Sequence, residues 1–438
     1  MKHTVEIERM AYGADAIGHL PDGKAVFVEG GAPGDVAEVE IVEDKGSFAR
    51  ATIAGLAEPS PQRVQPESPI DQVCGTAPWQ HLAYDAQLSA KRNNVVGALV
   101  HTAHFDEERA QAVVAACVGS KRTWNYRNKL ELGTGTDKDG RFVLGFYREG
   151  TNELVPAESS HLAHKQIERA PKALQGAIRY AQGNQDLGIF RVGVRHSLAT
   201  GELEVALWTK PGSFPRGLFA KTLSTACKTT SVVRVLADPG KARKIKGVEI
   251  LDGRGYWRER IGDVEFSTQA PSFFQVNTVQ AGKLVELVMQ GLGDLEGAYV
   301  ADLYAGGGTF SVPLALAGAD VIAVEAAGSS VRDLRFNAEN NGADLDVVGG
   351  DAARELADLG ELDALVVDPP RAGLAESVIG DIAEARPQRV AYVSCDPVTW
   401  ARDIARFEQS GYALASATPV DMFPQTYHVE TVSFLEPR

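Results

Sequence analysis

One cysteine occupies a position at which a reactive side chain could be presented. The apolar run RVAYVS predicts a strand over residues 389–394, and Cys395 follows directly in the sequence Ser-Cys-Asp-Pro. A lone cysteine is most often a small buried hydrophobic residue. Here the thiol stands between an apolar strand and a polar Asp-Pro turn. We therefore expect Cys395 to be partly exposed and to act as a nucleophile.

A second loop also follows an apolar run. Asp368-Pro369-Pro370-Arg371 comes after DALVV, which predicts a strand over residues 363–367. Open α/β sheets bind ligands beyond the carboxyl ends of their strands. Each proline fixes φ and so stiffens the loop. We expect this loop to lie near the Cys395 loop, beside a cofactor.

A glycine-rich loop predicts where that cofactor binds. Residues 302–310, DLYAGGGTF, stand between a predicted strand and a predicted helix. The three glycines permit a tight turn and a close approach by a ligand. Glu325 ends the next strand, where a carboxylate accepts hydrogen bonds from ribose hydroxyls, and Asp351 follows the third strand, near an adenine edge. This arrangement predicts an adenosine-containing cofactor.

The identity of that cofactor depends on Asp302. The loop is not GxGxxG, and a carboxylate at this place would repel the pyrophosphate of a dinucleotide. The same charge suits the amino group and sulfonium of S-adenosylmethionine. A nicotinamide cofactor and a purely structural turn are the alternatives.

A thiol beside a methyl donor indicates methylation of a pyrimidine carbon. Uracil C5 is a poor nucleophile, but attack of a thiolate on C6 gives C5 enolate character, and C5 can then accept a methyl group. A general base must afterwards remove the C5 proton so that the thiol can leave. Glu430, in the terminal apolar stretch HVETVSFL, is the candidate. The alternative is a solvated glutamate at a strand end.

Three segments with different patterns must position these residues. Residues 266–438 alternate short apolar runs with helical segments, which predicts a doubly wound, Rossmann-like α/β domain. Residues 1–57 contain about five short runs of period-two alternation, typical of an OB-like barrel, with AYGADAIGHLPDG as a turn. Residues 58–265 begin with a linker rich in Pro and Ser at 58–70 and continue as an α+β domain.

The totals limit the class of protein. The 438 residues are too many for one hydrophobic core. The four cysteines form no CxxC pair, which argues against a zinc ribbon and fits a reducing compartment. No apolar run approaches the roughly 20 residues of a membrane-spanning helix, and the first residues do not resemble a secretory signal. These features predict a cytoplasmic protein without a membrane partner.

Charge is distributed unevenly along the chain. The net charge is −14, but residues 1–90 carry about −8, residues 91–260 about +11 and residues 261–438 about −17. A basic segment between acidic flanks is expected when one surface faces phosphates. Chance clustering of solvated Lys and Arg is the alternative.

Taken together, the motifs resemble the RNA uracil-5-methyltransferase family, whose catalytic domain is a class I S-adenosylmethionine-dependent methyltransferase. The matching motifs, in the family's order, are FFQVN (residues 273–277), DLYAGGGTF, DPPRAG, SCDP and HVETV. The first 57 residues resemble the TRAM barrel. Residues 58–265, including WNYRNK at 124–129, resemble the family's central RNA-binding domain.

The resemblance implies roles for individual residues. It implies that Cys395 is the nucleophile, Glu430 the base and Asp368 a residue at the junction of substrate and cofactor. The cofactor-contacting positions would be Gln275, Tyr304, Thr309, Glu325, Asp351 and Asp368, although the family often has Asn at the position of Thr309. Gln275 would also approach the target base, and Lys121, Arg122, Arg127 and Lys129 would contact RNA phosphates, unless they are ordinary solvated side chains.

One departure concerns a metal cluster that many relatives hold with four cysteines. Only Cys74 remains here, with Ser68 and Ala77 at two of the other places and no cysteine near Ser159 or Ser160. One thiolate cannot hold such a cluster, so we predict no iron–sulfur cluster and no other metal. Gln80-His81-Leu82 still match the family. We expect the loop to persist, held by packing or hydrogen bonds.

Several functions stay open at this point. The TRAM-like barrel favours 23S ribosomal RNA as the substrate, and methylation of uridine 54 in transfer RNA is the alternative. An enzyme that methylates an exocyclic base amine would have an aromatic residue where Arg371 follows the two prolines, and it would need no cysteine. An RNA-binding protein that has lost catalysis would not need Cys395 and Glu430.

Overall fold

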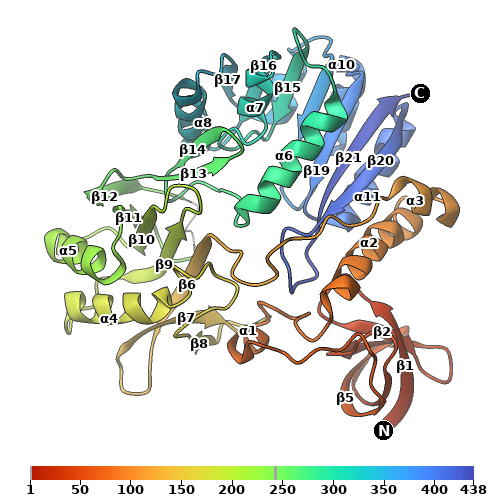
Figure 1. Ribbon diagram of the computed structural model, residues 1–438, viewed down its shortest axis with the longest axis horizontal. Helices are drawn as coiled ribbons and strands as arrows, with labels where there is room; N and C mark the ends of the chain where they lie inside the picture. The colour runs from red at the N-terminus through yellow and green to blue at the C-terminus, as the bar shows by residue number, and fades with distance from the viewer. Residues whose placement is uncertain (1, 241–243) are drawn as a thin grey trace. The chain divides into compact units, whose positions relative to one another are not determined.

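The computed structural model describes residues 2–240 and 244–438, and Figure 1 labels most of their helices and strands. The chain forms two compact units. The first unit comprises Met1–Thr123 and Asp368–Arg438, and the second comprises Trp124–Val367.

The first unit begins with a closed barrel in the strand order β1-β2-β3-β5-β4, which confirms the predicted barrel. Its strands are β1 (Lys2–Met10), β2 (Ala16–His19), β3 (Ala25–Glu29), β4 (Val36–Asp44) and β5 (Phe48–Glu58). Alternate residues such as Val5, Ile7 and Val26 fill the interior.

Strand β2 lies inside the segment that was predicted as a turn, so that prediction was wrong for residues 16–19. The reason is Gly18. A Cβ there would lie 2.4 Å from the carbonyl oxygen of Glu6, so only glycine lets β2 approach β1 this closely. Gly18 thus marks a close approach of two strands inside the segment that was predicted as a turn.

Three helices follow the barrel, α1 (Pro69–Val73), α2 (Tyr84–His101) and α3 (Glu107–Val113). No helix or strand lies between Glu58 and Pro69, where the linker was predicted. The buried side of α2 includes Lys91, Val95 and Leu99.

The second unit begins with a seven-stranded mixed sheet in the order β12-β11-β10-β9-β6-β7-β8. Its strands are β6 (Lys129–Thr136), β7 (Phe142–Tyr147), β8 (Leu154–Pro156), β9 (Ile189–His196), β10 (Leu203–Thr209), β11 (Ser231–Leu236) and β12 (Gly247–Gly253). Helices α4 (Ala170–Gln182) and α5 (Arg216–Cys227) contribute Leu174 and Phe219 to a core shared with the sheet residues Leu132, Val192 and Leu207. This is the α+β pattern predicted for the middle of the chain.

The same unit continues with the hairpin of β13 (Trp257–Ile261) and β14 (Val264–Thr268), and helix α6 (Thr278–Leu292) follows. The domain boundary predicted after residue 265 falls inside β14.

Four parallel strands then run in the order β17-β16-β15-β18. They are β15 (Tyr299–Leu303), β16 (Asp320–Glu325), β17 (Asp346–Gly349) and β18 (Ala364–Val367), and they alternate with α7 (Ser311–Leu316), α8 (Gly328–Asn341) and α9 (Ala352–Leu356). This alternation confirms the Rossmann-like prediction.

The C-terminal segment completes the first unit. It contains α10 (Glu376–Ala385), β19 (Arg389–Ser394), α11 (Pro397–Gln409), β20 (Tyr412–Val420) and β21 (Glu430–Pro437). Strand β21 lies between β19 and β20 and is antiparallel to both. No helix in the part of the chain that the structure describes combines the length and hydropathy needed to cross a bilayer.

Candidate active site

Strand register brings the predicted nucleophile and base to neighbouring positions. Ser394, the last residue of β19, pairs with Thr431 of antiparallel β21. Cys395 and Glu430 are the next residues outward on the two strands, so they lie opposite each other where the ladder ends.

Glu430 is not a solvated residue at a strand end. Its side chain is buried, with 4% exposure. Burial raises the pKa of the Glu430 carboxyl well above its ordinary value, the charge of Asp368 raises it further, and Arg371 lowers it. A carboxylate whose pKa is raised in this way is, once ionised, a stronger base than an ordinary carboxylate.

The Cys395 thiol is partly exposed and lies among acidic groups. Burial raises its pKa to about 12, and the carboxylates of Glu430 and Asp368 contribute to the rise, whereas the Arg371 guanidinium opposes it. A thiol with this pKa is protonated at neutral pH. It needs a base to take its proton when the sulfur attacks.

The turn after Cys395 begins a helix. Asp396 is the N-cap of α11, and its Oδ1 accepts hydrogen bonds from the backbone N–H groups of Val398 and Thr399, both at 3.0 Å. Pro397 fits the first helical position because its missing N–H would have no partner there. The positive end of the α11 dipole thus lies beside Cys395, where it favours a thiolate.

Helix α11 also holds the Asp-Pro-Pro-Arg loop. The Thr399 hydroxyl donates to the carbonyl of Arg371 at 2.9 Å, and Arg402 donates to the carbonyl of Ala372 at 2.8 Å. The backbone N–H of Leu374 donates to Asp403 at 2.8 Å. The two loops therefore lie together, as the sequence predicted.

One further side chain at this site was not predicted from the sequence. Tyr12, between β1 and β2 of the barrel, places its hydroxyl 3.4 Å from the carbonyl oxygen of Cys395 and 3.4 Å from Oδ2 of Asp396. No sequence motif surrounds Tyr12, so only the fold brings it to this place.

The glycine-rich loop and the predicted ribose-binding carboxylate meet in the second unit. The backbone N–H of Gly306 donates to Glu325 at 2.9 Å, and that of Ala327 donates to the same carboxylate at 2.6 Å. A Cβ at Gly306 would meet nothing within 4 Å, so the loop faces open space. Tyr304, just before it, has a φ of +64°, a conformation that non-glycine residues adopt mainly where the surrounding structure requires it.

Asp302 provides a test of whether the loop fits S-adenosylmethionine. Its side chain is buried, and Oδ2 accepts a hydrogen bond from the Ser311 hydroxyl at 2.5 Å. Oδ1 has no hydrogen-bond partner among the described residues. Burial raises the Asp302 pKa to about 7. A buried carboxylate oxygen without a donor fits a ligand that carries an ammonium group, as the methionine part of this cofactor does.

The remaining predicted cofactor residues are less enclosed. Thr309 is partly exposed in the turn before α7, and Asp351 is exposed at the N-cap of α9, where its Oδ1 accepts from the backbone N–H of Ala353 at 3.1 Å. Gln275 is buried, and its carbonyl accepts a hydrogen bond from the Asn128 side chain at 2.9 Å. Two residues earlier, the Phe273 ring is 68% exposed, which suits stacking on a base.

Comparisons with known proteins identify the family. The family model described as tRNA (Uracil-5-)-methyltransferase matches residues 83–358 and 352–438, and a TRAM domain model matches residues 2–54. The chain belongs to the RNA uracil-5-methyltransferase family. It is thus an S-adenosylmethionine-dependent RNA methyltransferase with an N-terminal TRAM barrel.

Relatives along the full length of the methyltransferase agree with this assignment. An uncharacterized RNA methyltransferase of Gloeobacter violaceus is 33% identical over 99% of this chain and 96% of its own, and one of Thermosynechococcus vestitus is 33% identical over 99% and 98%. The crystal structure of a Pyrococcus abyssi tRNA (uracil-54, C5)-methyltransferase in complex with S-adenosyl-L-homocysteine is 27% identical, with a TM-score of 0.76 and 99% of both chains covered.

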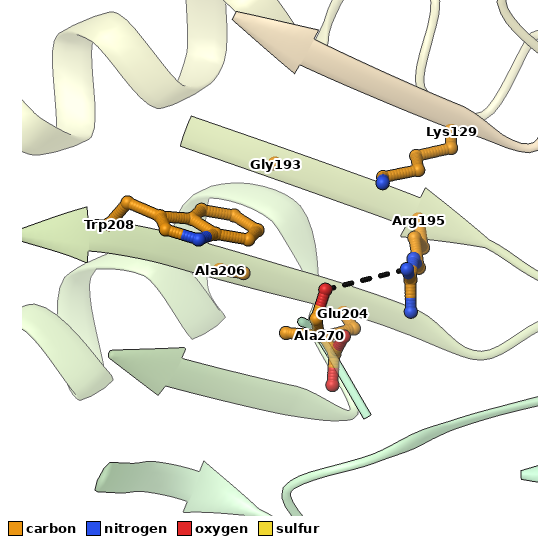
Figure 2. Close-up of a pocket in the computed structure, with 7 residues that line it drawn as sticks. All are labelled: Lys129, Gly193, Arg195, Glu204, Ala206, Trp208 and Ala270. Carbon is orange, nitrogen blue, oxygen red and sulfur yellow. Dashed lines mark hydrogen bonds between the residues drawn. The ribbon is translucent and has the colours of Figure 1, made fainter. Parts of the chain in front are cut away.

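Four basic residues of the methyltransferase were predicted to contact RNA phosphates, and two of them, Lys121 and Arg122, are exposed. Arg127 is partly buried, and Lys129 starts β6. The Lys129 side chain shares a small cavity with Arg195 and Glu204, whose side chains lie near it in Figure 2. Its Nζ lies 2.6 Å from a Glu131 oxygen, and burial lowers its pKa to about 8. The Lys129 ammonium is thus already paired with a carboxylate.

Hydrogen bonds hold the loop around Cys74, as the sequence predicted. Asp71 accepts from the hydroxyls of Ser68 and Thr76 at 2.6 and 2.7 Å. The Gln80 side chain accepts from the backbone N–H of Ser68 at 2.9 Å and donates to its carbonyl at 3.0 Å. Within residues 2–240 and 244–438, no group of three or more His, Cys, Asp or Glu side chains could hold a metal ion.

Proposed function

We propose that the methyltransferase modifies C5 of a uridine through a covalent bond between Cys395 and C6 of the base. The observation that carries the proposal is the pairing of β19 with β21, which leaves a partly exposed thiol opposite a buried carboxyl. C6 and C5 are neighbouring atoms on one edge of the uracil ring. The nucleophile must reach C6, and the base must reach the hydrogen on C5.

The proposed first step is attack by sulfur. The carboxylate of Asp368, which raises the pKa of Cys395, is our candidate to accept the thiol proton as the S–C6 bond forms. The C5–C6 π electrons then become an enolate whose negative charge lies on O4 and C5. When bound, the cofactor supplies a methyl group on a positively charged sulfur, and C5 accepts that group.

The proposed second step restores the ring. Ionised Glu430 takes the C5 proton, the electron pair of the C5–H bond re-forms the C5–C6 double bond, and the S–C6 bond breaks. The Cys395 sulfur leaves as a thiolate and regains a proton. The raised pKa of Glu430 supports this role because proton abstraction from carbon needs a base stronger than an ordinary carboxylate.

The test of the nucleophile is Cys395→Ala, with Cys227→Ala in the second unit as the control. We expect Cys395→Ala to abolish 5-methyluridine formation, measured by mass spectrometry of digested RNA, while cofactor binding in isothermal titration is retained. Full activity of Cys395→Ala would instead favour methylation of an exocyclic amine. Absence of cofactor binding by the unmodified protein would favour an RNA-binding protein without catalysis.

The RNA target is a separate proposal. We propose 23S ribosomal RNA because the chain carries a TRAM barrel. The Pyrococcus abyssi protein, which acts on uridine 54 of transfer RNA, covers 99% of this chain and supports the alternative. Mass spectrometry of both RNA classes from a deletion strain distinguishes them, because only the true target loses 5-methyluridine.

A further inference from the structure

Tyr12 lies in a barrel loop, between β1 and β2, whose backbone is held in place by hydrogen bonds. The loop containing Tyr12 is closed by a hydrogen bond from the backbone N–H of Ala11 to the carbonyl of Asp15, at 3.0 Å. The Asn94 side chain of α2 donates to the carbonyl of Ala11 at 3.2 Å, and the indole of buried Trp79 donates to the carbonyl of Gly13 at 3.0 Å. Three hydrogen bonds thus anchor the backbone on both sides of Tyr12.

The Tyr12 hydroxyl faces the turn that presents the nucleophile. It lies between the carbonyl oxygen of Cys395 and Oδ2 of Asp396, 3.4 Å from each. The other Asp396 oxygen, Oδ1, caps α11, so the two ends of this carboxylate have separate partners. Both distances are long for an O–H···O hydrogen bond. The single hydroxyl proton of Tyr12 can donate to only one of these two oxygens at a time, or be shared between them. Hydrogen bonds of this kind often tighten only when the substrate is bound.

The Tyr12 ring faces the segment that leads to the base. It meets the Tyr427 ring edge to face, with 5.8 Å between centroids, and the Tyr427 ring lies 4.3 Å from the ring of His428. Tyr427 itself packs against the hydrophobic core of the barrel. Tyr12 therefore lies between the turn that carries Cys395 and the segment that ends in Glu430.

The hydroxyl acts as a neutral donor. Burial and the charge of Asp396 raise the Tyr12 pKa above its ordinary value. Tyr12 therefore keeps its proton and cannot serve as the base for the thiol. A neutral donor can fix the orientation of the Cys395–Asp396 peptide and can compensate the Asp396 charge.

We infer that Tyr12 is a positioning residue for the Cys395 nucleophile, and that the TRAM barrel is therefore part of the catalytic apparatus of this methyltransferase. The inference rests on the covalent mechanism proposed above. In this role the Tyr12 hydroxyl holds the Ser394–Pro397 turn through its two oxygen contacts. The Tyr12 ring, packed on Tyr427, keeps that turn next to the segment before Glu430.

The test removes only the hydroxyl. We expect Tyr12→Phe to lower kcat about tenfold, the effect of one transition-state hydrogen bond, and to leave KM for RNA within about twofold. Tyr180→Phe is the matched control because Tyr180 is 74% exposed on α4 of the other unit. Thermal unfolding should show that both variants fold as well as the unmodified protein.

A second measurement separates positioning from a merely structural role. In a Glu430→Gln background, where the adduct should accumulate, Tyr12→Phe should slow the single-turnover formation of the Cys395–RNA bond about tenfold. An adduct rate and a kcat equal to those of the Tyr180→Phe control would overturn the inference while leaving the covalent mechanism intact. If the Cys395→Ala protein is active, the mechanism fails and the inference fails with it.

Discussion

At the scale of single residues, nearby negative and positive charges act in opposite directions on the pKa of the Cys395 thiol. Burial raises the pKa of the Cys395 thiol most, the carboxylates of Glu430 and Asp368 raise it further, and the Arg371 guanidinium lowers it. The sequence predicted Cys395 and Glu430 as partners because each follows or begins an apolar run. It could not predict that Glu430 is buried, because β19 and β20 cover it from both sides in the sheet.

Arg371→Gln should therefore make Cys395 less reactive. Without the guanidinium the thiol pKa rises, so alkylation by iodoacetamide at pH 9 should slow about threefold or more, and its pH profile should shift to higher pH. Mass spectrometry of the Cys395 peptide measures the rate. Cys227, whose pKa is raised by burial alone, is the internal control. An unchanged Cys395 rate would show that Arg371 has no electrostatic effect on the thiol.

At the scale of elements, local sequence patterns predicted many helices and strands. They did not predict features that depend on the close approach of segments distant in the sequence. The alternation of apolar runs with helical segments predicted the parallel strands β15 to β18 and the helices between them. Strand β2 was missed because it lies inside the segment AYGADAIGHLPDG, which was predicted as a turn. The position of Tyr12 was missed because it depends on how a barrel loop folds onto α2, which no local pattern encodes.

The loop of Ser68–Gln80 gives a stability prediction. Asp71→Ala removes the acceptor for two hydroxyls in a largely buried setting, so the free energy of unfolding should fall by about 2 kcal/mol. Urea unfolding followed by circular dichroism measures it, with Glu339→Ala on the exposed side of α8 as the control. Equal losses in the two variants would mean that the Asp71 hydrogen bonds do not stabilise the loop.

We also predict that this loop binds no iron–sulfur cluster. A single cysteine, Cys74, remains among the family's ligand positions, so protein prepared without oxygen should contain far less than stoichiometric iron and sulfide. Colorimetric assays of both elements test this. Stoichiometric iron with sulfide would mean that ligands other than cysteine complete a cluster.

At the scale of the whole molecule, the sequence predicted three consecutive segments, whereas the compact units join the first 123 residues to the last 71. Such a division depends on contacts between residues hundreds of positions apart, and periodicity does not report these. Composition did not reveal the buried charges of the central sheet either, since Glu204 and Arg195 stand in runs that read as ordinary strands.

Glu204 makes stability depend on pH. Burial raises its pKa from 4.5 to about 7, so the folded chain binds a proton that the unfolded chain has lost. This contribution leaves stability unaffected below about pH 4.5 and lowers it as pH rises toward 7. Glu204→Gln should therefore be more stable than the unmodified protein at pH 8, by up to about 3 kcal/mol, and the difference should shrink at pH 5. Chemical unfolding at both values measures it, and a difference independent of pH would contradict the assignment.

The most direct test of the central claim is capture of the covalent intermediate. Glu430→Gln removes the base but leaves Cys395, so incubation with substrate RNA and S-adenosylmethionine should yield a slowly migrating protein–RNA band. Mass spectrometry of that band should find methylated uridine attached to the Cys395 peptide, and Glu430→Gln combined with Cys395→Ala should give no band. Methyl transfer by Glu430→Gln at the normal rate, with no adduct, would contradict the account.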